Sequence, residues 1–312
     1  MNKIYKYLAI ALCALSLTAC GGDDDDDSTG SAAEKNVNAN DTQKSDYATR
    51  LEMPKILGGT NYLVLAKTTD DIGLNYTVEW DCIHHAQLWT CWQWDSSNSY
   101  KNWVRQNWSS GQTFNGYGGM GDPFQPDTEI PEDYRTELAD YQNSGYNRGH
   151  MCASEDRICS KEVNGQTFYL SNMHPQIYAF NGAVWSNMEA KVRNWRDAVV
   201  NNGGTMYVCK GGTIGDVTLD GKTSTGVIGY ISDGKVPVPK YFFMAVLKKT
   251  SSGVYSAMAF WAEHKADNST NLTPYMISVD ELEKRTGIDF FCNLPDEIEN
   301  KVEGILTDSE WK

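Results

Sequence analysis

Positive charge is scarce in this sequence. Its 27 lysines and arginines face 41 aspartates and glutamates, which gives a formal net charge of -14. A protein that coats nucleic acid needs a basic surface, because lysine and arginine neutralise the phosphates that it binds. The charge therefore excludes a basic coat protein. Any polyanion must be held by a local cluster of cations that works against the field of the whole chain.

The sequence also lacks an internal repeat, and no second long linker interrupts it after residue 50. With 312 residues, 40% of them hydrophobic, the chain is long enough to bury a sizeable core. We therefore expect one folded domain over residues 51–312.

The N-terminus is typical of a targeting segment. Lys3 and Lys6 precede an apolar run over residues 8–17, which is too short to cross a bilayer as a mature helix. This pattern predicts a removed signal peptide over residues 1–20. Its ending, Leu-Thr-Ala-Cys, resembles a bacterial lipobox in which Cys20 becomes lipidated. Acyl chains anchor a protein to a membrane, so we expect an outer-membrane lipoprotein facing the cell surface or the periplasm. An ordinary secretory signal with a chance cysteine is the alternative.

Residues 21–50 contain almost no apolar side chains. Five consecutive carboxylates, Asp23 to Asp27, repel one another and cannot pack. Such a composition buries too little surface to fold, which predicts a flexible, acidic and polar tether. The aspartate run resembles the acidic export tags of surface lipoproteins in some Gram-negative bacteria, and a solvated spacer is the simpler interpretation.

Cysteine usage fits an oxidising compartment. Six cysteines follow the signal segment, and an even number in an exported chain indicates up to three disulfides among about fifteen pairings. Closeness in sequence favours the first two of the three pairs that we predict: Cys82–Cys91, Cys152–Cys159 and Cys209–Cys292. The alternative is a zinc site formed by Cys82, His84, His85 and Cys91. The spacing of those four residues matches no usual zinc pattern.

Runs of alternating, aromatic-rich residues predict several strands. Residues 76–80 and 88–94 favour a hairpin. Further strands are expected at residues 166–173, 205–210, 226–231, 240–247 and 255–261. Residues 96–131 are rich in Gly, Ser, Asn and Asp, which predicts long loops. Helices are expected at residues 131–141, 182–200 and 279–287, with an acidic helix near the C-terminus.

The helix expected at residues 182–200 has two distinct faces. Apolar side chains recur at intervals of three and four and predict a face that packs on the sheet: Val184, Met188, Val192, Trp195 and Val199. A second row, at intervals of four, holds Asn181, Trp185, Glu189 and Arg193. This row places an amide, a carboxylate and a guanidinium on one side of the helix.

The stretch whose side chains best suit catalysis covers residues 146–157, Tyr-Asn-Arg-Gly-His-Met-Cys-Ala-Ser-Glu-Asp-Arg. Arg148 and His150 lie on either side of Gly149. Glycine leaves room for the close approach of a partner. Arginine offers a planar fork that suits phosphate, and histidine can take a proton near neutral pH. Alone, this tripeptide is a weak signal.

Two segments that follow strengthen the signal. Residues 168–176 are Phe-Tyr-Leu-Ser-Asn-Met-His-Pro-Gln, and residues 181–189 are Asn-Gly-Ala-Val-Trp-Ser-Asn-Met-Glu. Together the three segments resemble the DNA/RNA non-specific endonucleases, the endonuclease G-like ββα-metal nucleases. Weaker likeness at residues 124–127, 238–242 and 283–291 extends the resemblance over residues 55–312. It implies an α+β fold, in which a mainly antiparallel sheet is flanked by helices and a strand-loop-strand-helix metal unit lies at its edge.

The resemblance assigns the central roles of a phosphodiesterase. It implies that His150 is the general base that takes a proton from the attacking water. Asn181 would be the direct ligand of Mg²⁺, with Mn²⁺ as a second possible ion. Glu189 would hold the waters that such a hard ion keeps.

The remaining polar positions are assigned to the substrate. Arg148 and Arg193 would contact phosphate and its developing charge. Asn172 and Gln176 match positions that bind substrate or support the site in the family. The other histidines match no catalytic position and are interpreted as structural or surface residues: His84, His85, His174 and His264.

Each role has a simpler interpretation. Asn181 precedes the expected helix and suits an N-cap. Glu189 and Arg193 form an i,i+4 pair typical of a solvated surface, where it stabilises little. These interpretations do not explain why the parts follow one another in family order. One departure is Asn147, because the family commonly has aspartate there, whose loss would weaken loop ordering or change the metal shell.

Two functions follow from the sequence. The first is a lipid-anchored, Mg²⁺-dependent endonuclease that cuts DNA and RNA without strong sequence preference. The second is a catalytically impaired surface lipoprotein that keeps the nuclease fold as a binding module, which Asn147 and the acidic charge favour.

Overall fold

The computed structural model describes residues 36–306 and residue 311. The predicted signal peptide, the lipidation site Cys20 and the run Asp23–Asp27 lie outside these residues. No helix in the described part combines the length and the apolar content needed to cross a bilayer. The described residues all belong to one compact unit.

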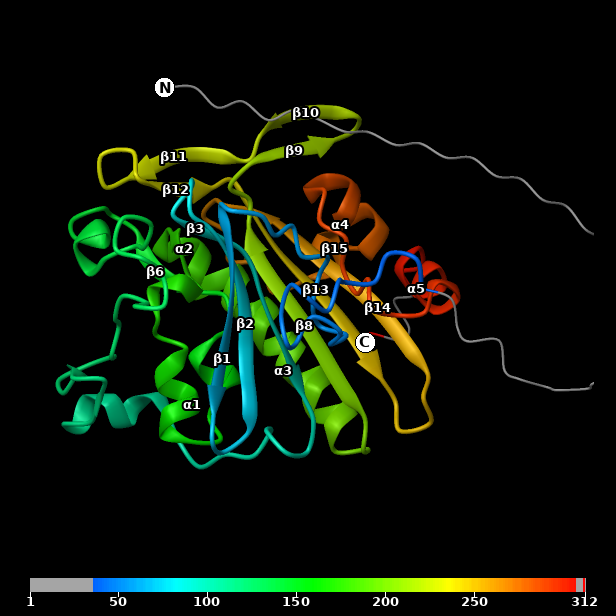
Figure 1. Ribbon diagram of the computed structural model, residues 1–312, viewed down its shortest axis with the longest axis horizontal. Coiled ribbons are helices and arrows are strands. Elements are labelled where there is room, and N and C mark those ends of the chain that lie inside the picture. The colour runs from blue at the N-terminus through cyan, green and yellow to red at the C-terminus, as the bar shows by residue number, and fades with distance from the viewer. Residues whose placement is uncertain (1–35, 307–310, 312) are drawn as a thin grey trace, which may run out of the picture. The chain divides into compact units, whose positions relative to one another are not determined.

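Seven strands form the central sheet in the order β1-β2-β3-β8-β13-β14-β15, and every neighbouring pair is antiparallel (Figure 1). Their bounds are Tyr62–Thr69, Gly73–Asp81, Ala86–Trp94, Thr205–Gly212, Tyr241–Lys249, Tyr255–Glu263 and Met276–Ile277. The predicted hairpin of residues 76–80 and 88–94 is confirmed as β2 and β3. The edge strands β1 and β15 were missed. The mainly antiparallel α+β class is confirmed.

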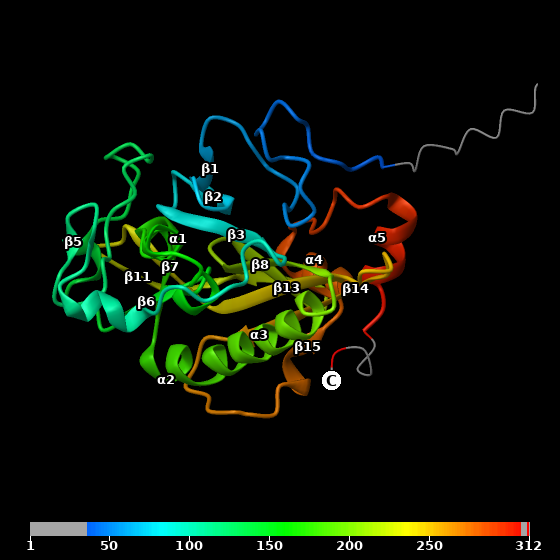
Figure 2. The same cartoon turned by 90° about the horizontal axis from the view of Figure 1, so that it is seen from below.

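The sheet is buried on both faces because alternate side chains of its strands face opposite sides. In β13, Phe242, Met244 and Val246 pack with the apolar row of α3, Ser186–Val200. The residues between them pack with α4, Val279–Thr286, and α5, Asp296–Glu303. Figure 2 shows α3 lying along one face of the sheet. The sheet therefore separates two cores, with α3 on one side and the C-terminal helices on the other.

Shorter elements complete the fold. Three two-stranded ribbons lie outside the central sheet. They pair β4, Thr113–Phe114, with β5, Tyr117–Gly118; β9, Asp216–Leu219, with β10, Lys222–Thr225; and β11, Val227–Ile231, with β12, Val236–Pro239. A fourth ribbon pairs β6, Asn147–His150, with β7, Met173–Gln176. In the sequence, the helix α1, Lys161–Gln166, falls between β6 and β7, and α2, Tyr178–Phe180, connects β7 to α3. This is the strand-loop-strand-helix unit that the resemblance implied.

Two secondary-structure predictions are wrong. Residues 166–173 contain the end of α1 and a 3-10 turn at Leu170–Asn172, and the strand begins only at residue 173. The Asn172 amide donates to the Thr167 carbonyl at 2.8 Å, so this apolar segment follows an irregular buried path. The helix expected at residues 131–141 is reduced to a 3-10 turn, Leu138–Tyr141, in which the Asp140 carboxylate accepts from the Glu137 amide at 2.7 Å.

Residues 36–50, which their composition placed in the tether, contact the domain. The side-chain amide of Asn40 is buried and donates to the Pro54 carbonyl at 2.9 Å. Asn36 donates to the Leu294 carbonyl at 2.6 Å, and Asn38 to Glu299 at 2.8 Å. The partners of Asn36 and Asn38 lie 258 and 261 residues away, so a local composition argument does not detect these two contacts.

The predicted disulfides are absent from the structure. All six cysteines beyond residue 36 are buried free thiols. Cys82 packs in the core beneath α3, whereas Cys91 lies in the core beneath α4, opposite Cys209 on β8. The sheet therefore separates the thiols of Cys82 and Cys91, which closeness in sequence had paired. The zinc alternative fails for the same reason, and His84 Nδ1 is paired instead with Asp81 at 2.6 Å.

Candidate active site

The β6–β7 ribbon fixes His150 at the end of a strand. Asn147 pairs with Gln176, Gly149 with His174, and His150 with Met173. A Cβ on Gly149 would lie 2.1 Å from Oε1 of Gln176, so only glycine fits between Arg148 and His150. The partner for which glycine leaves room is therefore a side chain of this same protein.

Asn172 and Gln176 are both fully buried, and neither lines a cavity at the site. The Asn172 side chain accepts from the Cys152 amide at 2.8 Å and donates to the Cys152 carbonyl at 2.8 Å. It thereby fixes the backbone just after His150. The burial of both side chains favours the role of supporting the ribbon, and substrate binding by these two residues stays a prediction.

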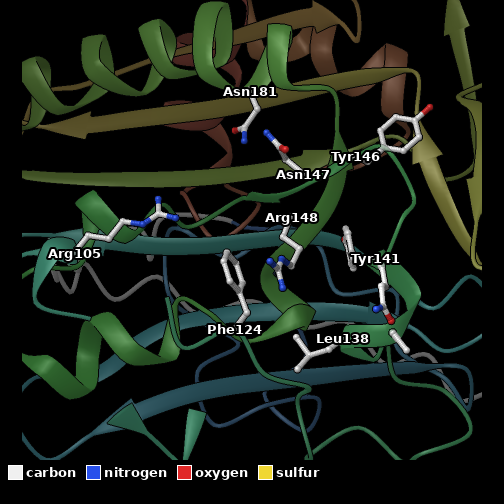
Figure 3. Close-up of a pocket in the computed structure, with 10 residues that line it drawn as sticks. Arg105, Phe124, Leu138, Tyr141, Tyr146, Asn147, Arg148 and Asn181 are labelled. Atoms are coloured by element: carbon white, nitrogen blue, oxygen red, sulfur yellow. The ribbon is translucent and has the colours of Figure 1, made fainter. Parts of the chain in front are cut away.

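Asn181 lies where the helix begins irregularly. It opens a π-helical turn, Asn181–Trp185, in which Ala183 has non-helical angles of φ -129° and ψ -105°. The N-cap of α2 is Ile177, and the Asn181 side chain makes no capping hydrogen bond. The N-cap interpretation is therefore wrong. Figure 3 shows the Asn181 amide pointing toward Asn147 at the wall of a pocket.

Two adjoining cavities surround these residues. The smaller, of about 310 Å³, is lined by Arg105, Arg148, His150, Asn181, Glu189 and Arg193 among others. The larger, of about 570 Å³, shares Arg105, Arg148 and Asn181 with it. Its walls add the aromatic side chains Phe124, Tyr141 and Tyr146. The structure thus brings the predicted base, metal ligand, carboxylate and both arginines to one cavity.

The His150 imidazole lies between aromatic rings. Its centroid is 5.6 Å from that of Phe124 and 5.0 Å from that of Phe168, and 9% of the residue is exposed. Nε2 has no hydrogen-bond partner among the described residues. Burial first, and then the charges of Arg105, Lys210 and Arg148, hold the pKa of His150 well below its ordinary value of 6.5. The ring is therefore neutral at physiological pH and able to accept a proton.

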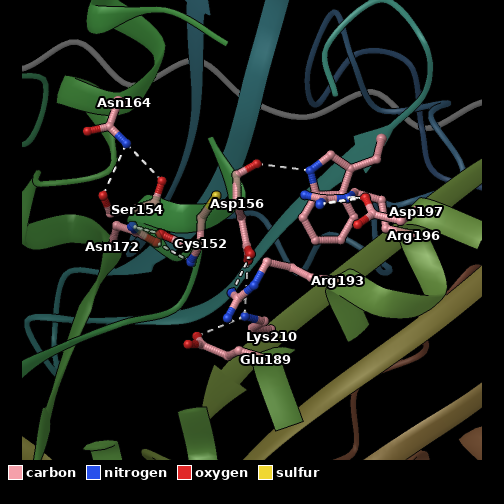
Figure 4. Close-up of polar contacts among 11 residues, drawn as sticks. Cys152, Ser154, Asp156, Asn164, Asn172, Glu189, Arg193, Arg196, Asp197 and Lys210 are labelled. Atoms are coloured by element: carbon pink, nitrogen blue, oxygen red, sulfur yellow. Dashed lines mark hydrogen bonds and ion pairs between the residues drawn. The ribbon is translucent and has the colours of Figure 1, made fainter. Parts of the chain in front are cut away.

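A buried ionic network lies behind the smaller cavity (Figure 4). Arg193 Nη1 donates to Asp156 Oδ1 at 2.9 Å. Nζ of Lys210, on β8, lies 3.4 Å from Asp156 Oδ2 and 3.1 Å from Glu189 Oε1. Lys210 is fully buried. The surface ion-pair interpretation of Glu189 and Arg193 is therefore wrong, because each is paired with a different, internal partner.

The charges in this network balance, with two carboxylates facing two cations. Burial alone would raise the pKa of Asp156, but Lys210 and Arg193 hold it below the ordinary carboxyl value. Burial keeps the pKa of Glu189 above its ordinary value despite the neighbouring Lys210. Glu189 is thus held in place by an ammonium group while it faces the cavity.

Two arginines line both cavities. The guanidinium of Arg148 lies 4.0 Å from the ring centroid of Phe124, a stacked arrangement that fixes its plane. Arg105 donates to both Asp122 oxygens, at 3.0 and 2.6 Å. Each retains edges that can reach a phosphate, because both line the cavity walls.

The sequence prediction missed three residues of the site. Arg105 lies in a loop, and no spacing marks it. Lys210 lies in a strand expected from its apolar neighbours. Asp156 belongs to the stretch around His150 and was not singled out. Lys210 has one signal, a charge within an apolar segment, because such a charge must find a buried partner. Asp156 stands between Glu155 and Arg157 and has no such signal.

The donors facing the cavity suit a hard cation. Asn181 offers an amide oxygen and Glu189 a carboxylate, whereas neither cysteine nor a second histidine faces the cavity among the described residues. Such a sparse oxygen set fits Mg²⁺, which keeps several of its waters. Soft ions that prefer thiolate ligands are disfavoured.

An antiparallel sheet carrying a β-β-α unit, with a neutral histidine and an asparagine at one cavity, defines the α+β fold of the ββα nucleases. The chain matches the DNA/RNA non-specific endonuclease family over residues 65–297, and it belongs to that family. The family expectation drawn from the three sequence segments is confirmed.

Several proteins resemble the chain. A nuclease of Syncephalastrum racemosum is 34% identical over 62% of this chain and 62% of its own length. A nuclease of Nostoc sp. is 30% identical over 67% of this chain and 73% of its own. Human mitochondrial endonuclease G is 29% identical over 55% of this chain and 57% of its own length. The match thus spans less than two thirds of the first and third relatives.

The fold has a counterpart among solved structures. A chain from the crystal structure of the EndoG/EndoGI complex superposes with a TM-score of 0.62 at 22% identity. The superposition covers 82% of this chain and 93% of the other. At this identity the likeness shows a common fold.

Proposed function

We propose that the protein is a metal-dependent endonuclease that hydrolyses phosphodiester bonds of DNA and RNA. The observation that carries the proposal is the position of His150. Its neutral ring lines the same cavity as Asn181, Glu189 and the two arginines Arg148 and Arg193. Family membership supports the same chemistry.

The residues divide the work of hydrolysis. The His150 imidazole takes a proton from the attacking water. Arg148 and Arg193 bind the phosphate oxygens and the charge that develops on them. Asn181 and Glu189 would hold Mg²⁺, or Mn²⁺, which when bound neutralises the phosphate and the leaving oxygen. Lys210 and Asp156 keep Glu189 and Arg193 in position.

The larger cavity suits the nucleoside next to the cleaved phosphate. Its volume of about 570 Å³ and its aromatic side chains Phe124, Tyr141 and Tyr146 accommodate a base and sugar. Base–aromatic stacking tolerates any sequence, because every base has a π face. Arg148 lies at the junction of both cavities, where the phosphate that joins two nucleosides would lie.

We also propose that Cys20 carries the lipid anchor and that the domain works outside the cytoplasm, at the outer membrane. This rests on the lipobox-like ending of the N-terminal segment. Detergent-phase partitioning tests it, because the wild-type chain should enter the detergent phase and Cys20→Ser should remain in the aqueous phase. A Cys20→Ser chain that partitions like the wild type contradicts the anchor.

Digestion of plasmid DNA and of structured RNA, with Mg²⁺ and with EDTA, tests the activity. The wild type should cleave both in Mg²⁺ only. His150→Ala should lose about 10²- to 10⁴-fold in rate, the usual contribution of a general base. His84→Ala is the matched control, since this histidine is partly exposed and paired with Asp81. Equal rates for the wild type and His150→Ala would refute the proposal.

A further inference from the structure

The face of the sheet opposite α3 holds a second group of charged residues. Asp280 and Glu283 lie one turn apart on α4, and Glu303 lies in the last turn of α5. One side-chain oxygen of each lies within 4.8 Å of those of the other two. Three carboxylates from two helices therefore converge on one point.

Glu283 Oε1 accepts from the Phe290 amide at 2.8 Å, but Glu303 lacks such a donor. Glu303 is 4% exposed, and its Oε1 is buried without a hydrogen bond from any described residue. None of the three carboxylates forms an ion pair within residues 36–306. A buried carboxylate without a cation or donor is costly, because it has lost its water and gained nothing in exchange.

The surroundings add negative charge. Glu283, Glu299 and Asp289 lie close enough to repel Glu303, and the nearby Lys55 acts on Asp289. Burial and these neighbours raise the pKa of Glu303 to about 10 and that of Glu283 to about 8.

The end of α5 also favours a cation. Oδ2 of Asp280 lies 3.4 Å from the position that a Cβ on Gly304 would take, so this carboxylate reaches the C-terminal end of the helix. The last carbonyl groups of a helix carry partial negative charge and lack intrahelical partners. Only the first turn of α4, where Asp280 itself lies, offers an opposing positive dipole.

We propose that Asp280, Glu283 and Glu303 form a Ca²⁺-binding site that joins α4 to the end of α5. Ca²⁺ prefers carboxylate oxygens at about 2.3–2.6 Å, so ligands on opposite sides of the ion lie about 5 Å apart, as these oxygens allow. Water completes the coordination, because Asp280 and Glu283 are only partly buried. The site lies across the sheet from the nuclease cavity and is independent of it.

The ion would hold together the two ends of the folded domain. Asn38 donates to Asp289 and Glu299, whose charges surround the site. Neutralising that charge stabilises α5 and the segment of residues 36–40 bound against it. The expected effect of Ca²⁺ is therefore on stability, with no requirement in catalysis.

Calorimetric Ca²⁺ titration and thermal unfolding of the full-length chain test the site. Both are performed in an Asn181→Ala background, which removes the ligand proposed for the nuclease ion. One Ca²⁺ should bind, and a hundredfold excess over its dissociation constant should raise the unfolding midpoint by roughly 5 °C. No saturable binding, or binding without a rise in the midpoint, would overturn the proposal.

Glu303→Gln locates the binding. It keeps the shape of the side chain, and it should weaken Ca²⁺ binding by about tenfold or more, because affinity follows the charge of the ligands. The matched control is Glu297→Gln, an exposed position on the same helix, which should bind as the background does. Unfolding in EDTA shows that Glu303→Gln folds. Unchanged Ca²⁺ affinity in Glu303→Gln would overturn the assignment.

Discussion

The two faces of the sheet hold buried carboxylates in opposite electrostatic settings. Beneath α3, Asp156 and Glu189 face Arg193 and Lys210, so the charges cancel within the protein. Beneath the C-terminal helices, Asp280, Glu283 and Glu303 form no ion pair within the described residues, and the nearby Lys55 acts on Asp289. The comparison shows how buried charge can be used in two ways. An internal cation fixes the carboxylate to which we assign a role in catalysis, whereas the three carboxylates without one form the ion site that we propose.

On the α3 face of the sheet, the cations that position Glu189 and Asp156 are side chains of the protein itself. Lys210 lies 5.1 Å from the ring centroid of Trp92 and 5.7 Å from that of Trp185, so aromatic rings as well as carboxylates surround it. A bound ion then has to be held by few ligands, since the protein already positions Glu189.

The largest effect is expected from Lys210→Met, which makes the nuclease face resemble the acidic one. It leaves two buried carboxylates with one cation, so the free energy of unfolding should fall by about 3–5 kcal/mol. Chemical denaturation measures this, with the exposed Lys284→Met as control. Adding Asp156→Asn to Lys210→Met should restore part of the lost stability. A Lys210→Met chain as stable as the wild type would show that the network is not charge-coupled.

Next in size is Arg148→Ala, which removes a guanidinium from the junction of the two cavities. Loss of one group that stabilises charge in the transition state lowers kcat/KM by about 100-fold. Arg148→Lys should recover little, because an ammonium group lacks the planar fork stacked on Phe124. Steady-state rates on a short RNA give the comparison, and Arg285→Ala, on the opposite face, should leave them unchanged. Full activity in Arg148→Lys would contradict the stacked geometry.

A smaller effect is expected from Tyr146→Ala in the larger cavity. Loss of one stacking surface should raise KM by about tenfold with kcat nearly unchanged, since stacking contributes about 1–3 kcal/mol per base. The exposed Tyr230 on β11 provides the control variant. An unchanged KM would show that the larger cavity does not hold a nucleoside.

The smallest effect concerns pH, and its sign differs between the two faces. The pKa of Glu303 is raised to about 10, so its contribution to stability is present below pH 4.5 and is lost as pH rises toward 10. The pKa of Asp156 is lowered, so its contribution is present above pH 3.8 and is lost as pH falls.

Unfolding midpoints measured in EDTA between pH 5 and 9 isolate the contribution of Glu303, because that of Asp156 stays constant over this range. The unfolding midpoint of the wild type should fall with rising pH, and the midpoint of Glu303→Gln should fall less. Identical slopes for the two chains would show that Glu303 does not titrate in this range.

The features that the sequence predicted are those with a short-range pattern. The apolar run in residues 241–247 reflects a strand buried on both faces, and the helical period in residues 182–200 reflects a helix with one face on the core, so β13 and α3 were predicted well. His150, Asn181 and Glu189 were found because three segments follow one another in family order. Their common cavity confirms that the segments fold together.

The failures involve contacts between distant residues. Lys210 and Asp156 are 54 residues apart, and neither has a neighbour in sequence that indicates the pair. Asn172 belongs to the family pattern, and its sequence context does not indicate that its side chain binds the Cys152 backbone. The convergence of α4 and α5 brings together carboxylates that look like ordinary solvated charge in either helix alone.

Chemical rescue of His150→Ala tests the central claim most directly. In this variant the smaller cavity keeps Asn181, Glu189 and both arginines but lacks the imidazole. If His150 is the base, added imidazole should restore RNA cleavage in Mg²⁺ in proportion to its neutral fraction, rising with pH through its titration. Cleavage by His150→Ala that is as fast as wild type, or that imidazole leaves unchanged, would contradict the role assigned to this histidine.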